Sequence, residues 1–102
     1  MIYLLAIIVA KPGMRDAILA AFQANAPTVR AEPGCIEYTA VVDMADAPTF
    51  QVPVGPDTFI VVEKWAGKQA LEAHAAAPHM ASYSATTRPW IESRTLHILS
   101  AA

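Results

Sequence analysis

The chain alternates between segments with the hydrophobic pattern of strands and segments with that of helices. Residues 2–10 (IYLLAIIVA) are apolar at every position, and their length and Ile/Val content predict a strand buried on both faces. A turn at residues 11–13 (KPG) follows. The next segment is predicted to be a helix, because its apolar residues recur at helical spacing: Met14, Ile18, Phe22 and Val29. Pro27 lies within this helix and is expected to kink it or to split off its last turn.

The second half of the chain predicts three more strands and two short helices. Residues 35–43 (CIEYTAVVD) and 58–65 (TFIVVEKW) have strand composition, and the latter is rich in β-branched and aromatic residues. Between them, residues 44–57 contain three prolines and a glycine, which indicates a long excursion, either a lid or an arm that embraces a partner subunit. Residues 67–77 predict an alanine-rich helix, Pro78 begins another, and residues 93–99 (SRTLHIL) form the last strand.

The predicted order is strand, helix, strand, strand, helix, strand. This βαββαβ order is typical of the ferredoxin-like α+β fold, a four-stranded antiparallel sheet with helices on one face. We therefore expect a single domain over residues 1–102. The other face of such a sheet would be bare in a monomer, yet the first strand is apolar at every position. Two sheets packed face to face would cover it, so the sequence predicts a homodimer.

Composition and charge exclude several classes of partner. The net charge is -2 and the basic residues are scattered, so the chain lacks the clustered Lys/Arg surface that nucleic acids require. The longest apolar run, residues 1–10, is about half of the ~20 residues needed to span a bilayer, and no basic segment precedes it. The single cysteine, Cys35, cannot form an internal disulfide. We expect a cytoplasmic protein without nucleic-acid or membrane partners.

Three stretches together resemble the antibiotic biosynthesis monooxygenase (ABM) family, particularly its quinol monooxygenase-like members. They are residues 32–38 (EPGCIEY), 62–65 (VEKW) and 70–80 (ALEAHAAAPHM). The resemblance implies a dimeric α+β barrel with a pocket in each subunit. It also implies that Leu96, Ile98 and Leu99 of the last strand contribute to the dimer contact. The best-known members oxygenate phenolic or polycyclic aromatic molecules with O2 as co-substrate, without metal or flavin, and other relatives degrade haem or isomerise lactones.

Two residues are the candidates for catalysis. An imidazole titrates near neutral pH, so His74 on the inner face of its helix is suited to removing a proton from a phenolic hydroxyl. The alternative for His74 is a half-buried histidine that is hydrogen-bonded for structural reasons. Trp65, at the end of the third strand, provides either an aromatic wall for a flat substrate or a core side chain that closes the sheet. Glu37 and Glu63 are interpreted as outward-facing charges on strands.

Six further residues are candidates for contacts with an aromatic substrate, and core packing is the alternative for each apolar one. His79 follows His74 across Pro78 at five residues, which does not match the i, i+4 spacing of paired metal ligands on a helix, so no metal site is expected. Arg88 and Arg94 are candidates for binding an anionic oxygen or are solvated surface residues. The six candidates for the substrate pocket are Phe22, Tyr38, His79, Met80, Tyr83 and Trp90.

The function that the resemblance implies for these residues is cofactor-independent monooxygenation of a phenolic or hydroquinone-type small molecule. A site with one histidine and an apolar pocket suits this chemistry, because the protein needs only to remove a proton, hold the anion near O2 and exclude water. Haem degradation is a weaker alternative, since relatives with that activity use an Asn on the first strand and residues 2–10 contain none. A non-catalytic dimeric module that binds a hydrophobic small molecule is the second alternative.

Overall fold

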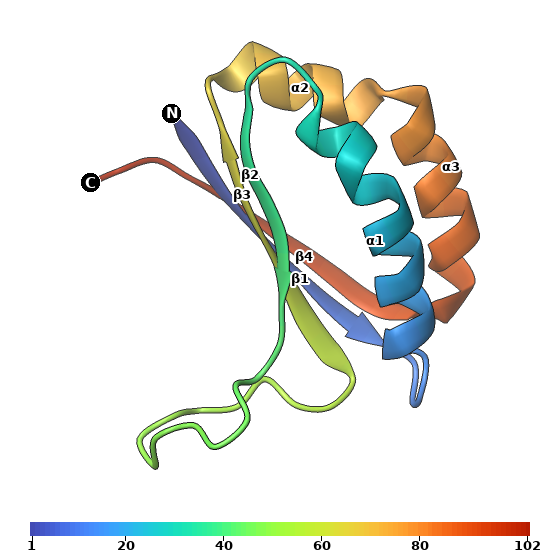
Figure 1. The fold of residues 1–102 in the computed structure, drawn as a ribbon, viewed down its shortest axis with the longest axis vertical. Coiled ribbons are helices and arrows are strands. Elements are labelled where there is room, and N and C mark those ends of the chain that lie inside the picture. Colours follow the sequence, from blue (N-terminus) through green and yellow to red (C-terminus); the bar gives the residue numbers. More distant parts are fainter.

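The computed structural model describes all residues from 1 to 102 as one sheet covered on one face by helices (Figure 1). The strands are β1 (Ile2–Ala10), β2 (Cys35–Val41), β3 (Thr58–Trp65) and β4 (Ile91–Leu99). The helices are α1 (Arg15–Arg30), α2 (Lys68–Ala76) and α3 (Pro78–Thr87), and a short 3₁₀ helix, η1 (Arg88–Trp90), leads into β4. The strands are antiparallel in the order β2-β3-β1-β4. The ferredoxin-like α+β fold predicted from the sequence is confirmed. None of the helices combines the length and the hydropathy that a membrane-spanning segment needs.

Strand β1 separates the core from the face of the sheet that carries no helix. Leu4, Ala6, Ile8 and Ala10 are buried beneath the helices, and the residues between them are half-buried on the other side. The sequence predicts that β1 is buried on both faces. One face is buried in this chain, and the second is not, because no element covers it (Figure 1). We call that second surface the helix-free face; its apolar side chains are Tyr3, Leu5, Ile7, Val9, Val41, Ile60, Val62 and Leu99.

Helix α1 supplies the largest part of the helical contribution to the core. Its buried residues recur at helical spacing, as the sequence predicts, and the aromatic ring of Phe22 stacks on Tyr38 with centroids 4.8 Å apart. Pro27 does not split the helix, which runs unbroken to Arg30. Because Pro27 lies in the last turns and is exposed, the hydrogen bond that its missing N–H removes is lost near the solvated end of the helix. The buried residues of α1 are Ile18, Phe22, Ala26 and Val29.

Residues 44–57, which we call the arm, connect β2 to β3 and extend beyond the ends of these strands (Figure 1). The Asp43 carboxylate closes the base of the arm by accepting hydrogen bonds from the backbone N–H groups of Val54 (2.8 Å) and Gly55 (2.9 Å). These bonds lower the pKa of Asp43. Phe50 and Val52 in the arm are 88% and 87% exposed. The sequence prediction of a long excursion is confirmed, whereas its roles as lid or partner-embracing arm stay predictions.

Candidate active site

A cavity of about 310 Å³ lies between the sheet and the helices α2 and α3. This volume is at the lower end of the ~300–1,000 Å³ typical of small-molecule sites. A second hollow of about 250 Å³ adjoins it and shares Met80, Ser84 and Arg94 with it. Six apolar side chains line the first cavity, namely Leu4, Leu71, Ala75, Met80, Ala81 and Leu96. An apolar lining of this size suits a small aromatic molecule.

Four polar residues complete the wall of the cavity: Glu63 from β3, His74 from α2, Ser84 from α3 and Arg94 from β4. His74 and Glu63 are each only 6% exposed. The indole N–H of Trp65 donates a hydrogen bond to Glu63 Oε1 at 2.9 Å, and His74 Nε2 lies 4.0 Å from the same oxygen. The Trp65 and His74 rings lie 4.5 Å apart, tilted by 32°. The wall of the cavity thus contains an acid, a base and a cation, and the acid and the base lie side by side.

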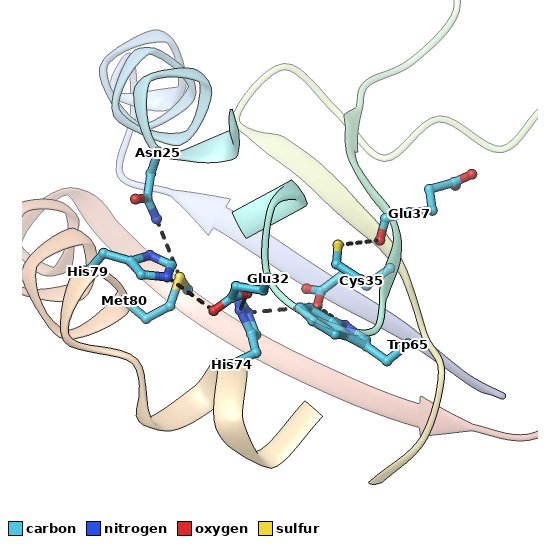
Figure 2. Close-up of polar contacts among 9 residues, drawn as sticks. Asn25, Glu32, Cys35, Glu37, Trp65, His74, His79 and Met80 are labelled. Carbon is cyan, nitrogen blue, oxygen red and sulfur yellow. Dashed lines mark hydrogen bonds and ion pairs between the residues drawn. The ribbon is translucent and has the colours of Figure 1, made fainter. Parts of the chain in front are cut away.

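On the side of His74 away from Glu63, the imidazole contacts a second carboxylate, that of Glu32 (Figure 2). His74 Nδ1 lies 2.7 Å from Glu32 Oε2, and His79 Nε2 lies 3.1 Å from Glu32 Oε1. Glu32 comes from the loop between α1 and β2, whereas the two histidines come from α2 and α3. Glu32 therefore joins two helices through its two carboxylate oxygens.

Burial shifts the acid–base properties of the residues around His74. It raises the pKa of Glu63 above its usual value, although the hydrogen bond from Trp65 and the proximity of His74 partly offset the rise. Burial, followed by the charge of Glu63, strongly raises the pKa of the Tyr38 hydroxyl, and burial raises the pKa of Tyr83 to about 12. Both tyrosines are therefore protonated at neutral pH and do not act as bases there.

Comparison with known proteins assigns the chain to a family. The model of the antibiotic biosynthesis monooxygenase family matches residues 1–86. The chain belongs to this family. It is 36% identical over 101 residues to "Probable quinol monooxygenase YgiN" of Escherichia coli K12, covering 97% of this chain and 96% of that protein. Family membership and this relative support a monooxygenase-type function.

Solved structures share the fold of this chain. PA3566 from Pseudomonas aeruginosa superposes with a TM-score of 0.80 at 26% identity, covering 99% of this chain and 93% of that one. Rv0793 from Mycobacterium tuberculosis superposes with a TM-score of 0.80 at 22% identity, covering 99% and 94% of the two chains. The second likeness bears on the fold alone.

The residues predicted for the ABM-type site lie in three places. His74 and Met80 line the cavity, and Met80 and Tyr83 line the adjoining hollow. Trp65, Phe22 and Tyr38 are buried in the core, where Trp65 reaches the site through its bond to Glu63. The remaining two lie further from the cavity: His79 lines a shallow hollow between α1 and α3, and Trp90 packs against the core from η1. Their roles in substrate binding stay predictions.

Two residues of the site do not follow from the sequence analysis. The interpretation of Glu63 as an outward-facing charge is wrong, since its side chain is buried and faces the helices. The strand pattern contains the signal, because Glu63 has the same parity as the buried Phe59, Val61 and Trp65. Glu32 gives no periodic signal, since it lies in a turn 42 residues before His74, and only its place at the start of the family-like stretch 32–38 (EPGCIEY) singles it out. No group of three or more His, Cys, Asp or Glu side chains is arranged to hold a metal ion.

Proposed function

We propose that the protein is a cofactor-independent monooxygenase that oxidises a hydroquinone-type aromatic molecule with O2 in the cavity between the sheet and α2–α3. The observation that carries this proposal is the placement of His74 in the wall of an apolar cavity, with Nε2 close to the buried Glu63. Family membership and the name of the relative from Escherichia coli support the class of reaction and of substrate.

His74 is the proposed base. Its Nε2 takes the proton of a substrate hydroxyl, and the imidazolium that forms has Glu63 Oε1 at 4.0 Å. Arg94, in the same wall, is the proposed cation that stabilises the substrate oxyanion. Trp65 acts through Glu63, because it is fully buried and donates its indole N–H to that carboxyl group. The apolar side chains of the wall are proposed to reduce the contact of the anion with water.

The proposed chemistry balances without a further reactant. The hydroquinone anion donates one electron to O2, which gives a semiquinone radical and superoxide, and the two combine into a carbon–oxygen bond. The resulting hydroperoxide loses its outer oxygen as water and leaves a hydroxyquinone. The substrate has then gained one oxygen atom and lost two hydrogen atoms to the water that forms. One hydroquinone and one O2 thus give one hydroxyquinone and one water.

The proposed working unit is a homodimer joined through the helix-free face and strand β4. The support is the number of apolar side chains on that face, together with 41%, 60% and 45% exposure of Leu96, Ile98 and Leu99 on β4. An apolar surface of this extent is typical of an interface rather than of a free monomer surface.

Oxygen uptake tests the proposed reaction. Purified protein treated with a chelator is presented with a panel of benzo- and naphthohydroquinones and anthrones, each compared with its own autoxidation rate. We expect uptake above this rate for at least one hydroquinone. In His74→Ala, kcat should fall by about 10²–10⁴-fold, the usual contribution of a general base. Glu72→Gln, a change at an exposed position on the same helix, is the control and should retain full activity.

Two results would contradict the proposal. Full activity in His74→Ala would remove His74 from the reaction. A hydroquinone that binds but is recovered unchanged in air would indicate the non-catalytic binding module instead.

A further inference from the structure

The Glu32 carboxylate lies between two histidine rings, each on a different helix (Figure 2). Glu32 is largely buried, with 15% of its side chain exposed, and each of its two oxygens contacts one imidazole nitrogen. The proposed reaction leaves this contact without a role, since it involves only the Nε2 side of the His74 ring.

The chemistry of a carboxylate determines which nitrogens carry hydrogen. A carboxylate only accepts hydrogen bonds, so His74 Nδ1 and His79 Nε2 must both be donors to Glu32. A neutral imidazole has one N–H, and the other nitrogen then holds a lone pair. In neutral His74 that second nitrogen is Nε2, the one on the side of Glu63 and the cavity.

His79 gives independent support for this assignment. Its Nδ1 is buried without any hydrogen-bond partner. A buried N–H without an acceptor is costly, and a nitrogen that carries only a lone pair avoids the cost of an unpaired donor. The ring is therefore best described with its proton on Nε2, donated to Glu32.

We propose that Glu32 is a positioning residue that holds His74 in the Nδ1–H tautomer, so that Nε2 is free to accept a proton from the substrate. This inference rests on the proposed function for its catalytic part. Glu32 acts through His74 because it faces an outer hollow, lined also by Pro33, Gln69 and Ala73, and is not part of the cavity wall. His79 fixes the second oxygen of Glu32 and so orients the carboxylate.

The same arrangement stabilises His74 after it takes a proton. The imidazolium carries N–H groups on both nitrogens, with Glu32 Oε2 at 2.7 Å from Nδ1 and Glu63 Oε1 at 4.0 Å from Nε2. Two carboxyl groups on opposite sides of the ring thus favour the charged product of proton transfer over the neutral ring.

The first part of the test does not require turnover. In wild-type protein labelled with ¹⁵N on histidine, two-bond ¹H–¹⁵N correlation spectra report which ring nitrogen carries hydrogen. We expect neutral His74 to be protonated at Nδ1 and unprotonated at Nε2. A neutral His74 with its proton on Nε2 would overturn the proposal, whatever the activity of the protein.

The second part measures Glu32→Gln on the hydroquinone accepted by the wild type. A glutamine has one acceptor oxygen for two histidines, so one ring must lose its acceptor or change tautomer. We expect kcat to fall by about 10- to 100-fold, part of the contribution of a general base, with KM nearly unchanged because Glu32 does not line the cavity. The spectrum of His74 should change in parallel, and Glu72→Gln should change neither quantity.

The outcomes separate the two proposals. Full kcat in Glu32→Gln, with wild-type turnover dependent on His74, would overturn the positioning role and leave the proposed function intact. Absence of wild-type turnover would overturn the proposed function and the catalytic part of this inference. The spectrum of His74 would still test whether its proton lies on Nδ1, as the contact with Glu32 requires. If Glu32→Gln does not fold, a wild-type spectrum in which neutral His74 carries its proton on Nε2 still overturns the proposal.

Discussion

The surroundings of Glu63 shift the ionisation of its carboxyl group. It lies on the core side of β3 with the indole N–H of Trp65 as its hydrogen-bond donor and with His74 4.0 Å away. Removing a carboxylate from water favours its protonated form, and one hydrogen bond compensates only in part. A buried carboxyl group with a raised pKa reduces the stability of the fold. Such groups are typical of functional sites, where the shifted pKa serves the chemistry.

The stability of the protein should depend on the ionisation of Glu63. Its pKa is raised in the folded state above the reference value of 4.5, so the contribution of the protonated group is complete below about pH 4.5 and is lost as pH rises through the folded pKa. Glu63→Gln does not ionise and keeps an acceptor for Trp65. We expect its free energy of unfolding to exceed that of the wild type by an amount that grows as pH rises towards neutrality.

Urea unfolding of both proteins at several pH values and one protein concentration measures this difference. A difference that stays constant from pH 4.5 upwards would show that Glu63 has the same pKa in the folded and unfolded states.

At the residue scale, the sequence predicts His74 but neither of its carboxyl partners. His74 is identifiable because its residue type and helix face are local properties. Glu63 could be found from the parity of β3, in which every second residue is buried. Glu32 could not, because its contacts depend on how the loop after α1 approaches α2 and α3 in the folded chain.

At the scale of elements, the position of Glu32 depends on a close approach between the loop after α1 and the helix α2. Gly34 has a φ of +83°, and a Cβ built on it would lie 2.6 Å from the Cβ of Ala70. The backbone N–H of Ala66 also donates to the Gly34 carbonyl at 2.8 Å. Glycine is therefore required at position 34 both for its conformation and for the space it leaves.

Gly34→Ala should be markedly destabilising. It incurs the cost of a left-handed residue, about 1–2 kcal/mol, and also the cost of a steric overlap, so we expect a total loss of about 2–5 kcal/mol in the free energy of unfolding. Gly13→Ala is the matched control, because Gly13 has a φ of +78° with no atom within 4 Å of the added Cβ, and should lose only the first contribution. Equal losses in the two variants, measured by urea unfolding, would contradict the close approach.

The boundaries of the elements are largely predictable, because they depend on local hydrophobic periodicity and on Pro and Gly. The predicted strand over 35–43 is shorter in the structure and ends at Val41, and the last strand begins earlier, at Ile91. Of the two outcomes expected at Pro27, the separation of the last turn is absent, since α1 runs unbroken to Arg30. The helix continues past Pro27 to Arg30, so the loss of one backbone hydrogen bond at this exposed position does not end it.

At the scale of the whole molecule, the sheet has one face packed against helices and one face without a cover. In the central rows of the helix-free face, Leu5 lies opposite Val62, and Ile7 lies between Ile60 on β3 and Thr95 on β4. The apolar pattern of β1 predicts this surface from the sequence. The proposed homodimer explains why a strand with one face outside the core has no polar residue on either side.

Ile7→Asp should convert the proposed dimer into monomers. The substitution places a charge at the centre of the helix-free face, where a second subunit would bury it at a high desolvation cost. Sedimentation velocity measures the change, and Gln23→Asp on the exposed side of α1 is the control that should sediment as the wild type does. A wild-type protein that sediments as a monomer, or an Ile7→Asp protein that remains dimeric, would contradict an interface at this face.

Oxygen-18 labelling distinguishes a monooxygenase from an oxidase, since it reports whether an atom of O2 enters the substrate. Wild-type protein is given its preferred hydroquinone under labelled O2, with a parallel reaction in labelled water to measure exchange, and the product is analysed by mass spectrometry. We predict a hydroxyquinone that carries one labelled oxygen from O2, with the second labelled atom in water. An unlabelled quinone formed together with hydrogen peroxide would show an oxidase and would contradict the proposed monooxygenation.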